Sequence, residues 1–129
     1  MRFFIASNTA NHGRVIMLAK IMEKLGHINT MPVSTESIRE SEGALSQASY
    51  SEVQAIRDTE FFLLMLPGSR EAQTELGIAL SSRYGKRIII WSETGNEFAV
   101  DDACIYYYHP SIMRMVFSFS ELIQFIKNL

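Results

Sequence analysis

Residues 66–80 bring a carboxylate close to a potential anion site. An apolar run at residues 61–66 turns through a Pro-Gly pair into a helical pattern, and Glu75 lies near its start. Backbone N–H groups at such a helix start can bind an anion, and Glu75 is expected to face the same opening. Glycosyl transfer needs this pairing, because a phosphate or sugar must be anchored while a carboxylate lies beside the anomeric carbon.

Two acidic residues are predicted to be catalytic. A carboxylate near a helix N-terminus is stabilised by roughly 0.3–1 kcal/mol, so Glu75 is expected to be ionised at pH 7. An ionised carboxylate can attack an anomeric carbon and hold the sugar covalently. Glu52, on the helix before the strand, can handle the proton. From the residues alone, the alternatives are a helix-capping Glu75 and a solvated Glu52.

Small polar residues are predicted to bind the substrate. Gly68, Ser69 and Arg70 stand at the helix start, where a hydroxyl, backbone N–H groups and a cation can surround a phosphate. Ser7 and Asn8 follow the first apolar run and offer a second set of contacts. A ligand with a 5' phosphate is therefore expected. The alternatives are a plain helix cap with a solvated arginine, and a neutral nucleoside as the ligand.

Composition limits the classes of function. The 129 residues are 47% hydrophobic with a formal net charge of −2, which predicts a single domain over residues 1–129. Without a basic stripe, neither a nucleic-acid polymer nor a membrane is expected as a partner. The single cysteine, Cys104, excludes an intrachain disulfide and a multi-cysteine metal site. The longest apolar runs are too short to span a bilayer or to form a signal peptide. We expect a cytoplasmic protein that needs no metal and no cofactor.

Apolar runs alternate with helical patterns along the chain. Strands are expected at residues 2–6, 28–33, 61–66, 87–91 and 104–108, with a short extended piece near 115–117. Helices are expected at residues 15–25, 51–58, 70–84 and 118–129, with stops at Gly26 and Gly85 and a capping box at Ser118 and Glu121. Residues 34–51 are polar and serine-rich, and they are predicted to form a lid loop with a short helix.

This pattern predicts an α/β fold with three layers. Strands that are apolar throughout and alternate with helices indicate a parallel sheet covered on both faces. We therefore expect a doubly wound domain, flavodoxin-like or Rossmann-like, with a five-stranded parallel sheet. Ligands bind such sheets at the carboxyl ends of the strands. The candidates that follow predicted strands are Ser7, Asn8, Gly68, Ser69 and Ser92.

Three segments of the chain resemble the nucleoside 2-deoxyribosyltransferase-like family, including its deoxynucleoside 5'-monophosphate N-glycosidase branch. Residues 4–8 (FIASN) are similar to the end of the family's first strand. Residues 52–63 are similar to its acid-x3-Ile motif and the strand after it. Residues 66–80 carry the most specific likeness, because Glu75 precedes Leu-Gly as the family's nucleophile does.

The resemblance implies roles for individual residues. Glu75 would be the nucleophile and Glu52 the acid near the sugar or base. Ser69 would stand where the monophosphate branch has a phosphate-binding serine, and Ser7 and Asn8 would line the same pocket. Phe4 belongs with the predicted substrate-binding residues, but it stands where many members have a tyrosine that orients the nucleophile. Other departures are two glutamates, Glu52 and Glu60, in place of aspartates, and residues 70–73 in place of a glycine-rich stretch.

The predicted function is cleavage or transfer at the N-glycosidic bond of a (deoxy)nucleoside or nucleoside 5'-monophosphate. One alternative is a nucleotide-binding sensor without turnover, which Phe4 and residues 70–73 favour. Another is an interaction domain with no nucleotide site. The expected partner is a small-molecule nucleoside or nucleotide. The resemblance also implies a homodimer or larger homo-oligomer with shared sites, in which residues 92–100 reach a neighbour.

Overall fold

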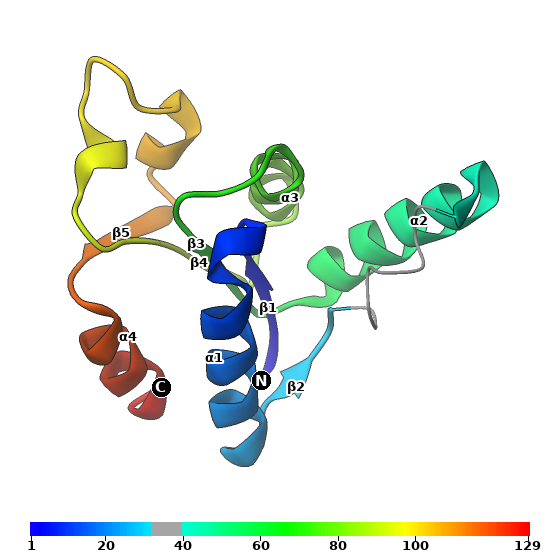
Figure 1. The fold of residues 1–129 in the computed structure, drawn as a ribbon, viewed down its shortest axis with the longest axis horizontal. Coiled ribbons are helices and arrows are strands. Elements are labelled where there is room, and N and C mark those ends of the chain that lie inside the picture. The colour runs from blue at the N-terminus through cyan, green and yellow to red at the C-terminus, as the bar shows by residue number, and fades with distance from the viewer. Residues whose placement is uncertain (32–39) are drawn as a thin grey trace.

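A parallel sheet between helices forms the body of the molecule (Figure 1), and the computed structural model describes residues 1–31 and 40–129. The strands are β1 (Arg2–Ala6), β2 (Ile28–Asn29), β3 (Phe61–Met65), β4 (Arg87–Ser92) and β5 (Ile112–Val116). The helices are α1 (His12–Lys24), α2 (Glu42–Asp58), α3 (Arg70–Ser81) and α4 (Phe119–Lys127). The strand order is β2-β1-β3-β4-β5, and every pairing is parallel. The predicted doubly wound α/β fold is confirmed.

Alternate strand residues supply two separate cores, one on each face of the sheet. Phe3 and Ile5 pack with residues of α1 and α4, whereas Phe4 and Ala6 pack with residues of α2 and α3. All five residues of β3 are buried, as expected for a central parallel strand covered on both sides. The sheet is therefore the middle one of three layers.

The boundaries of two helices follow local sequence signals. Gly26, just after α1, has a φ of 93°, which glycine adopts without strain, so it ends the helix as predicted. Ser118 precedes α4, and its Oγ accepts a hydrogen bond from the backbone N–H of Glu121 at 3.2 Å. The predicted cap of the last helix is therefore confirmed.

The prediction of a fifth strand at residues 104–108 is wrong. Ile105–Tyr108 forms a 3₁₀ helix in which only Tyr107 is buried, so the run of β-forming residues is overridden by its surroundings. The fifth strand is β5, which overlaps the expected extended piece near residues 115–117. It lies at the sheet edge, and most of its side chains are only partly covered. Its sequence therefore lacks the continuous apolar pattern of a buried strand.

Helix α2 is longer than predicted. It begins at Glu42 rather than at residue 51, with Ser41 Oγ accepting from the N–H of Ala44 at 3.0 Å. Only Ala55 and Ile56, near its C-terminus, are buried, because the first half of α2 projects from the body (Figure 1). A projecting helix does not show the apolar periodicity of a packed one. The predicted strand at residues 28–33 is described only as far as 31, and the predicted loop at 34–51 only from residue 40.

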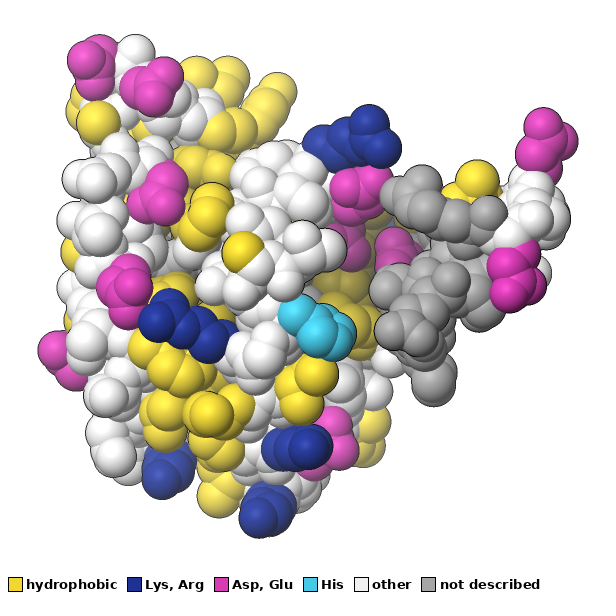
Figure 2. Space-filling view, in the orientation of Figure 1, with side chains coloured by type: hydrophobic (Ala, Val, Ile, Leu, Met, Phe, Trp, Pro, Cys, Tyr) yellow, Lys and Arg dark blue, Asp and Glu magenta, His cyan; other side chains and the backbone are white. Residues whose placement is uncertain are grey.

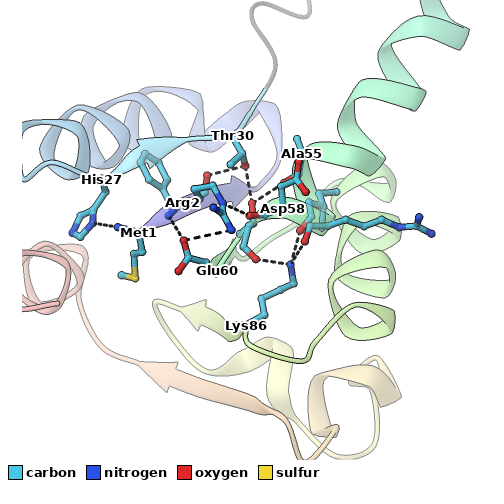
Figure 3. A network of polar contacts seen from close by, with 12 residues as sticks. Met1, Arg2, His27, Thr30, Ala55, Asp58, Glu60 and Lys86 are labelled. Atoms are coloured by element: carbon cyan, nitrogen blue, oxygen red, sulfur yellow. Dashed lines mark hydrogen bonds and ion pairs between the residues drawn. The ribbon is translucent and has the colours of Figure 1, made fainter.

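Polar contacts at the amino ends of the strands pair the charged groups there (Figure 3). The Arg2 N–H donates to Glu60 Oε1 at 3.1 Å, and Arg2 Nε donates to the Asp58 carbonyl at 2.6 Å. Lys86 Nζ donates to carbonyls at the C-terminal end of α2, Ile56 at 2.6 Å and Arg57 at 3.3 Å, and to that of Thr59 at 2.6 Å. This edge of the sheet is therefore tied together by matched donors and acceptors.

Candidate active site

A cleft of about 430 Å³ opens at the carboxyl ends of β1 and β3. The sheet order reverses between these two strands, where crossovers diverge and doubly wound folds bind ligands. Helix α2 forms the far wall. We call this site the acidic cleft, and its described lining consists of Ile5, Ala6, Ser7, Thr9, Met31, Leu45, Ala48, Ser49, Glu52, Ser69, Glu71 and Glu75.

Three carboxylates line the acidic cleft. Glu71 and Glu75 lie four residues apart on α3 and so share one helix face, while Glu52 comes from α2. Figure 2 shows acidic side chains gathered in the hollow on the side of α3 that faces α2. The packing of α3 beside α2 therefore brings Glu52 and Glu75, the two predicted catalytic acids, into one cleft.

Burial changes the protonation of these acids. It raises the pKa of Glu75 to about 8, with further contributions from the nearby charges of Glu52 and Glu71. The pKa of Glu52 is also raised, first by burial and then by Glu71. The prediction that Glu75 is ionised at pH 7 is therefore wrong for the unliganded protein. A helix N-terminus stabilises a carboxylate, but by less free energy than burial and two nearby negative charges cost it.

The turn into α3 shapes the floor of the acidic cleft. Ser69 Oγ accepts from the N–H of Ala72 at 3.1 Å and caps the helix. A side chain at Gly68 would place its Cβ 2.9 Å from Gln73 Nε2 and 3.3 Å from Ala72 Cβ. The strand can therefore turn this tightly onto the helix because residue 68 has no side chain.

Hydrogen bonds join this turn to the end of β1. Ser7 Oγ donates to the Met65 carbonyl at 2.8 Å, and Ser69 Oγ lies 3.3 Å from the Ser7 carbonyl. Asn11 Nδ2 donates to Ser7 Oγ at 2.9 Å and lies 3.4 Å from the Leu66 carbonyl. The structure thus brings Ser7 and Ser69 together with the acids and holds them on a rigid edge.

Four other sequence-predicted residues do not line the acidic cleft. Phe4 is fully buried and stacks on Phe62 with ring centroids 5.8 Å apart. Asn8 Oδ1 accepts from the N–H of Asn11 at 3.1 Å and so caps the turn after β1. Gly68 packs beneath α3. Arg70 points outward, its side chain 86% exposed and its Nε 3.2 Å from Glu71 Oε1.

Arg70 lines a second cavity, which we call the adjoining groove. It measures about 300 Å³ between α2 and α3 and shares Ser49 and all three acids with the acidic cleft. Its other described lining residues are Val53, Ile56, Arg70, Thr74 and Ile78. The carboxylates therefore lie between a polar compartment at the strand ends and a more apolar one between the helices.

Sequence reasoning assigned no catalytic or substrate-binding role to Glu71, Thr9 or Ser49, whereas it placed Asn11 with Ser7 and Asn8 in a second set of possible phosphate or base contacts. Glu71 could have been found from its spacing of four residues before Glu75, which puts both on one helix face. Ser49 could be assigned to the cleft only once α2 was known to begin at Glu42. Asn11 contacts Ser7 and the Leu66 carbonyl but is not among the described lining residues of the acidic cleft.

Two further findings concern the described residues as a whole. Within residues 1–31 and 40–129, no three or more His, Cys, Asp or Glu side chains are grouped so that they could hold a metal ion. Over the same ranges, no helix has both the length and the apolar character needed to cross a membrane.

Comparison with known proteins identifies the fold. Neither a family profile nor a curated protein matches the sequence. Among solved structures, the CMP N-glycosidase BcmB of Clostridium botulinum is similar to this chain with a TM-score of 0.71 and 19% identity, over 99% of this chain and 98% of that one. A conserved protein from Enterococcus faecalis V583 is similar with a TM-score of 0.57 and 12% identity, over the same shares. The whole chain thus has the fold of an N-glycosidase.

Proposed function

We propose that this protein cleaves the N-glycosidic bond of a nucleoside or nucleotide, with Glu75 as the carboxylate that meets the anomeric carbon. The observation that carries the proposal is the convergence of Glu75, Glu52 and Glu71 in one cleft at the carboxyl ends of the strands. The shared fold with a CMP N-glycosidase supports the reaction class. The motif around Glu75 supports the choice of nucleophile.

The electrostatics of the acidic cleft suit this reaction. Glycosidic cleavage passes through an oxocarbenium-like transition state that carries positive charge on the sugar. Glu52 and Glu75, whose ionisation is disfavoured in the unliganded cleft, would both be favoured as carboxylates by that developing charge. Their interaction with the transition state therefore exceeds their interaction with a neutral ground state, which is the condition for catalysis.

The proton balance can be written with two of these acids. Ionised Glu75 attacks C1' and forms a glycosyl ester. The C1'–N bond breaks, and the electron pair of that bond passes to the base nitrogen. Glu52, whose pKa is raised, supplies the proton that the departing base needs. Water then attacks the glycosyl ester, its proton returns to Glu52, and Glu75 leaves as a carboxylate. A second base in place of water would give transfer rather than hydrolysis.

A nucleotide-binding sensor without turnover is the second candidate. It is favoured by the pKa of about 8 at Glu75, since a protonated carboxyl is a poor nucleophile at pH 7. The buried Phe4 also has no hydroxyl with which to orient Glu75. A sensor would bind the same ligands but release no base.

Base release from a panel of nucleosides and nucleoside monophosphates, followed by chromatography, tests the proposal. We expect release by the wild-type protein and at least a thousandfold loss in Glu75→Gln, about 4 kcal/mol in the barrier. Glu23→Gln is the matched control, because Glu23 is an exposed acid on α1 that does not line the acidic cleft. Binding without release from any substrate would favour the sensor. The expected homo-oligomer is tested separately by light scattering, against the 14.7 kDa chain mass.

A further inference from the structure

Tyr107 is a buried residue outside the acidic cleft whose hydroxyl reaches helix α3. Its side chain is 6% exposed, and the hydroxyl donates to Gln73 Oε1 at 3.0 Å. Burial raises the pKa of Tyr107, so the hydroxyl keeps its proton at neutral pH and can act as the donor. The hydrogen bond therefore joins the 3₁₀ helix Ile105–Tyr108 to the first turns of α3.

Tyr107 is itself held by its neighbours. Arg114 Nη1, from β5, donates to the Tyr107 carbonyl at 3.0 Å. The Phe98 ring meets the Tyr107 ring edge to face, with centroids 6.0 Å apart and an interplanar angle of 88°. The Tyr107 N–H donates to the Cys104 carbonyl at 3.0 Å. A donor that is fixed on several sides can hold the side chain that it contacts in one place.

Gln73 carries this restraint to the turn that begins α3. Its Nε2 lies 2.9 Å from the point where a Cβ at Gly68 would stand, so the amide packs directly against that turn. Successive residues of a helix are rotated by about 100°, so Gln73, two positions before Glu75, lies on the opposite side of α3. Glu75 therefore faces the acidic cleft while Gln73 holds the same part of the helix from behind.

Helix α2 gives the start of α3 little support. Only Ala55 and Ile56, near the C-terminus of α2, are buried, and its first half projects from the body. Where Glu52 faces Glu75, the two helices are separated by the acidic cleft rather than joined by packed side chains. The like charges of these two acids also disfavour a closer approach when both are ionised. The first turns of α3 must therefore be held from their other side.

We propose that Tyr107 and Gln73 are positioning residues, whose hydrogen bond fixes the first turns of α3 and so places Glu75 at the acidic cleft. This inference rests on the proposed N-glycosidic function, in which the Glu75 carboxylate must meet C1'. A misplacement of about 1 Å can cost on the order of a hundredfold in rate. Neither Tyr107 nor Gln73 is among the described lining residues of the cleft, so the pair acts through the helix.

Tyr107→Phe tests the inference, because it removes one hydroxyl and leaves the ring in the core. We expect kcat for base release to fall about tenfold, with KM within about twofold of the wild type. Carbon-13 NMR should show a pKa of Glu75 that is lower by at least about half a pH unit, because a looser α3 lets water reach the carboxyl group and moves it away from Glu52. Loss of stability alone would change neither quantity in a protein measured well below its melting temperature. Tyr106→Phe is the matched control, since Tyr106 is 59% exposed on the same 3₁₀ helix.

Gln73→Met tests the other half of the pair. It removes the acceptor, so alone or combined with Tyr107→Phe it should cost about the same tenfold in kcat as Tyr107→Phe alone. Losses that multiply in the double variant would assign the effect of Tyr107 to another contact and overturn the proposed pair. An unchanged titration of Glu75 in folded Tyr107→Phe would also overturn it. If the wild-type protein released no base, the proposed function would fail, and the titration would still decide whether the pair places Glu75.

Discussion

The two ends of the sheet hold their charged side chains in opposite ways. At the amino end, Glu60 accepts the N–H of Arg2, and its pKa is lowered mainly by that hydrogen bond. At the carboxyl end, Glu75 is buried beside Glu52 and Glu71, and its pKa rises to about 8. The amino end therefore stabilises its charged side chains, whereas the carboxyl end destabilises its own.

This difference indicates where the fold is stabilised and where it can act. Matched donors and acceptors, such as Lys86 with its three carbonyls, contribute to stability and leave little free energy for a ligand to gain. Acids that repel one another cost stability and are relieved when a positive charge develops beside them. Perturbed carboxyl groups in a cleft therefore mark the carboxyl end as the candidate site.

The pH dependence of activity should give the largest effect. Because Glu75 must be ionised while Glu52 still holds the proton that it donates, kcat/KM for base release should follow a bell-shaped pH profile. The rate should fall about tenfold per pH unit well to either side of the optimum. A rate that rises to an alkaline plateau would contradict the role of Glu52, and a rate that does not change with pH would contradict both roles.

Removing the cation of the amino end should affect stability and not activity. Lys86→Met removes the lysine donor from three carbonyls, of which that of Ile56 keeps the Thr59 N–H, and is expected to lower the free energy of unfolding by about 2 kcal/mol. Urea denaturation measures the change, and kcat should stay within about twofold. Lys127→Met, at an exposed lysine of α4, serves as control. A large loss of activity in a folded Lys86→Met protein would contradict the view that the amino end contributes to stability and not to activity.

A pair of glycine variants tests the packing of the carboxyl end. Gly68→Ala introduces a Cβ within 2.9 Å of Gln73 and is expected to destabilise by about 1–3 kcal/mol. Gly77→Ala lies on the same helix with nothing within 4 Å of the added Cβ, so it should stabilise by about 0.5–1 kcal/mol. Thermal melts distinguish the two. Equal effects of the same sign would mean that the turn into α3 is not tightly packed.

The surface acid of the amino end should give the smallest effect. Because the pKa of Glu60 is lowered on folding, its contribution stabilises the protein above about pH 4.5 and is lost as the pH falls below its folded pKa. Glu60→Gln should therefore melt slightly below the wild type at pH 7, and the gap should close on acidification. A difference in melting temperature that widened in acid would contradict a lowered pKa for Glu60.

The fold was largely predictable because its signals are local. Apolar strands, Gly26 as a helix stop and the Ser118 cap each depend on a few neighbouring residues. The wrong predictions concern segments whose structure depends on contacts outside the segment. The run at 105–108 is rich in β-forming residues but forms a 3₁₀ helix, and the start of α2 projects into solvent without an apolar face.

The position of the candidate cleft was predictable, and its electrostatics were not. The rule that strand ends meet at one edge predicted the meeting of Ser7 and Ser69, and the motif pointed to Glu75. The protonation of Glu75 depends on how closely α2 packs against α3, which brings Glu52 from more than twenty positions away. The hydrogen bond of the Ser7 hydroxyl depends on the carbonyl of Met65, 58 positions away. Such contacts are non-local and leave no trace in a single sequence.

Direct titration of the glutamate carboxyl groups by carbon-13 NMR tests the central claim, that the two ends of the sheet hold carboxylates in opposite states. In the unliganded protein, with assignments made from Glu75→Gln and Glu60→Gln, Glu75 should titrate near pH 8 and Glu60 below 4.5. A nucleoside that carries positive charge on its base or sugar should then lower the pKa of Glu75. If Glu75 and Glu60 both titrate near 4.5, the carboxyl end is not electrostatically perturbed and the account is wrong.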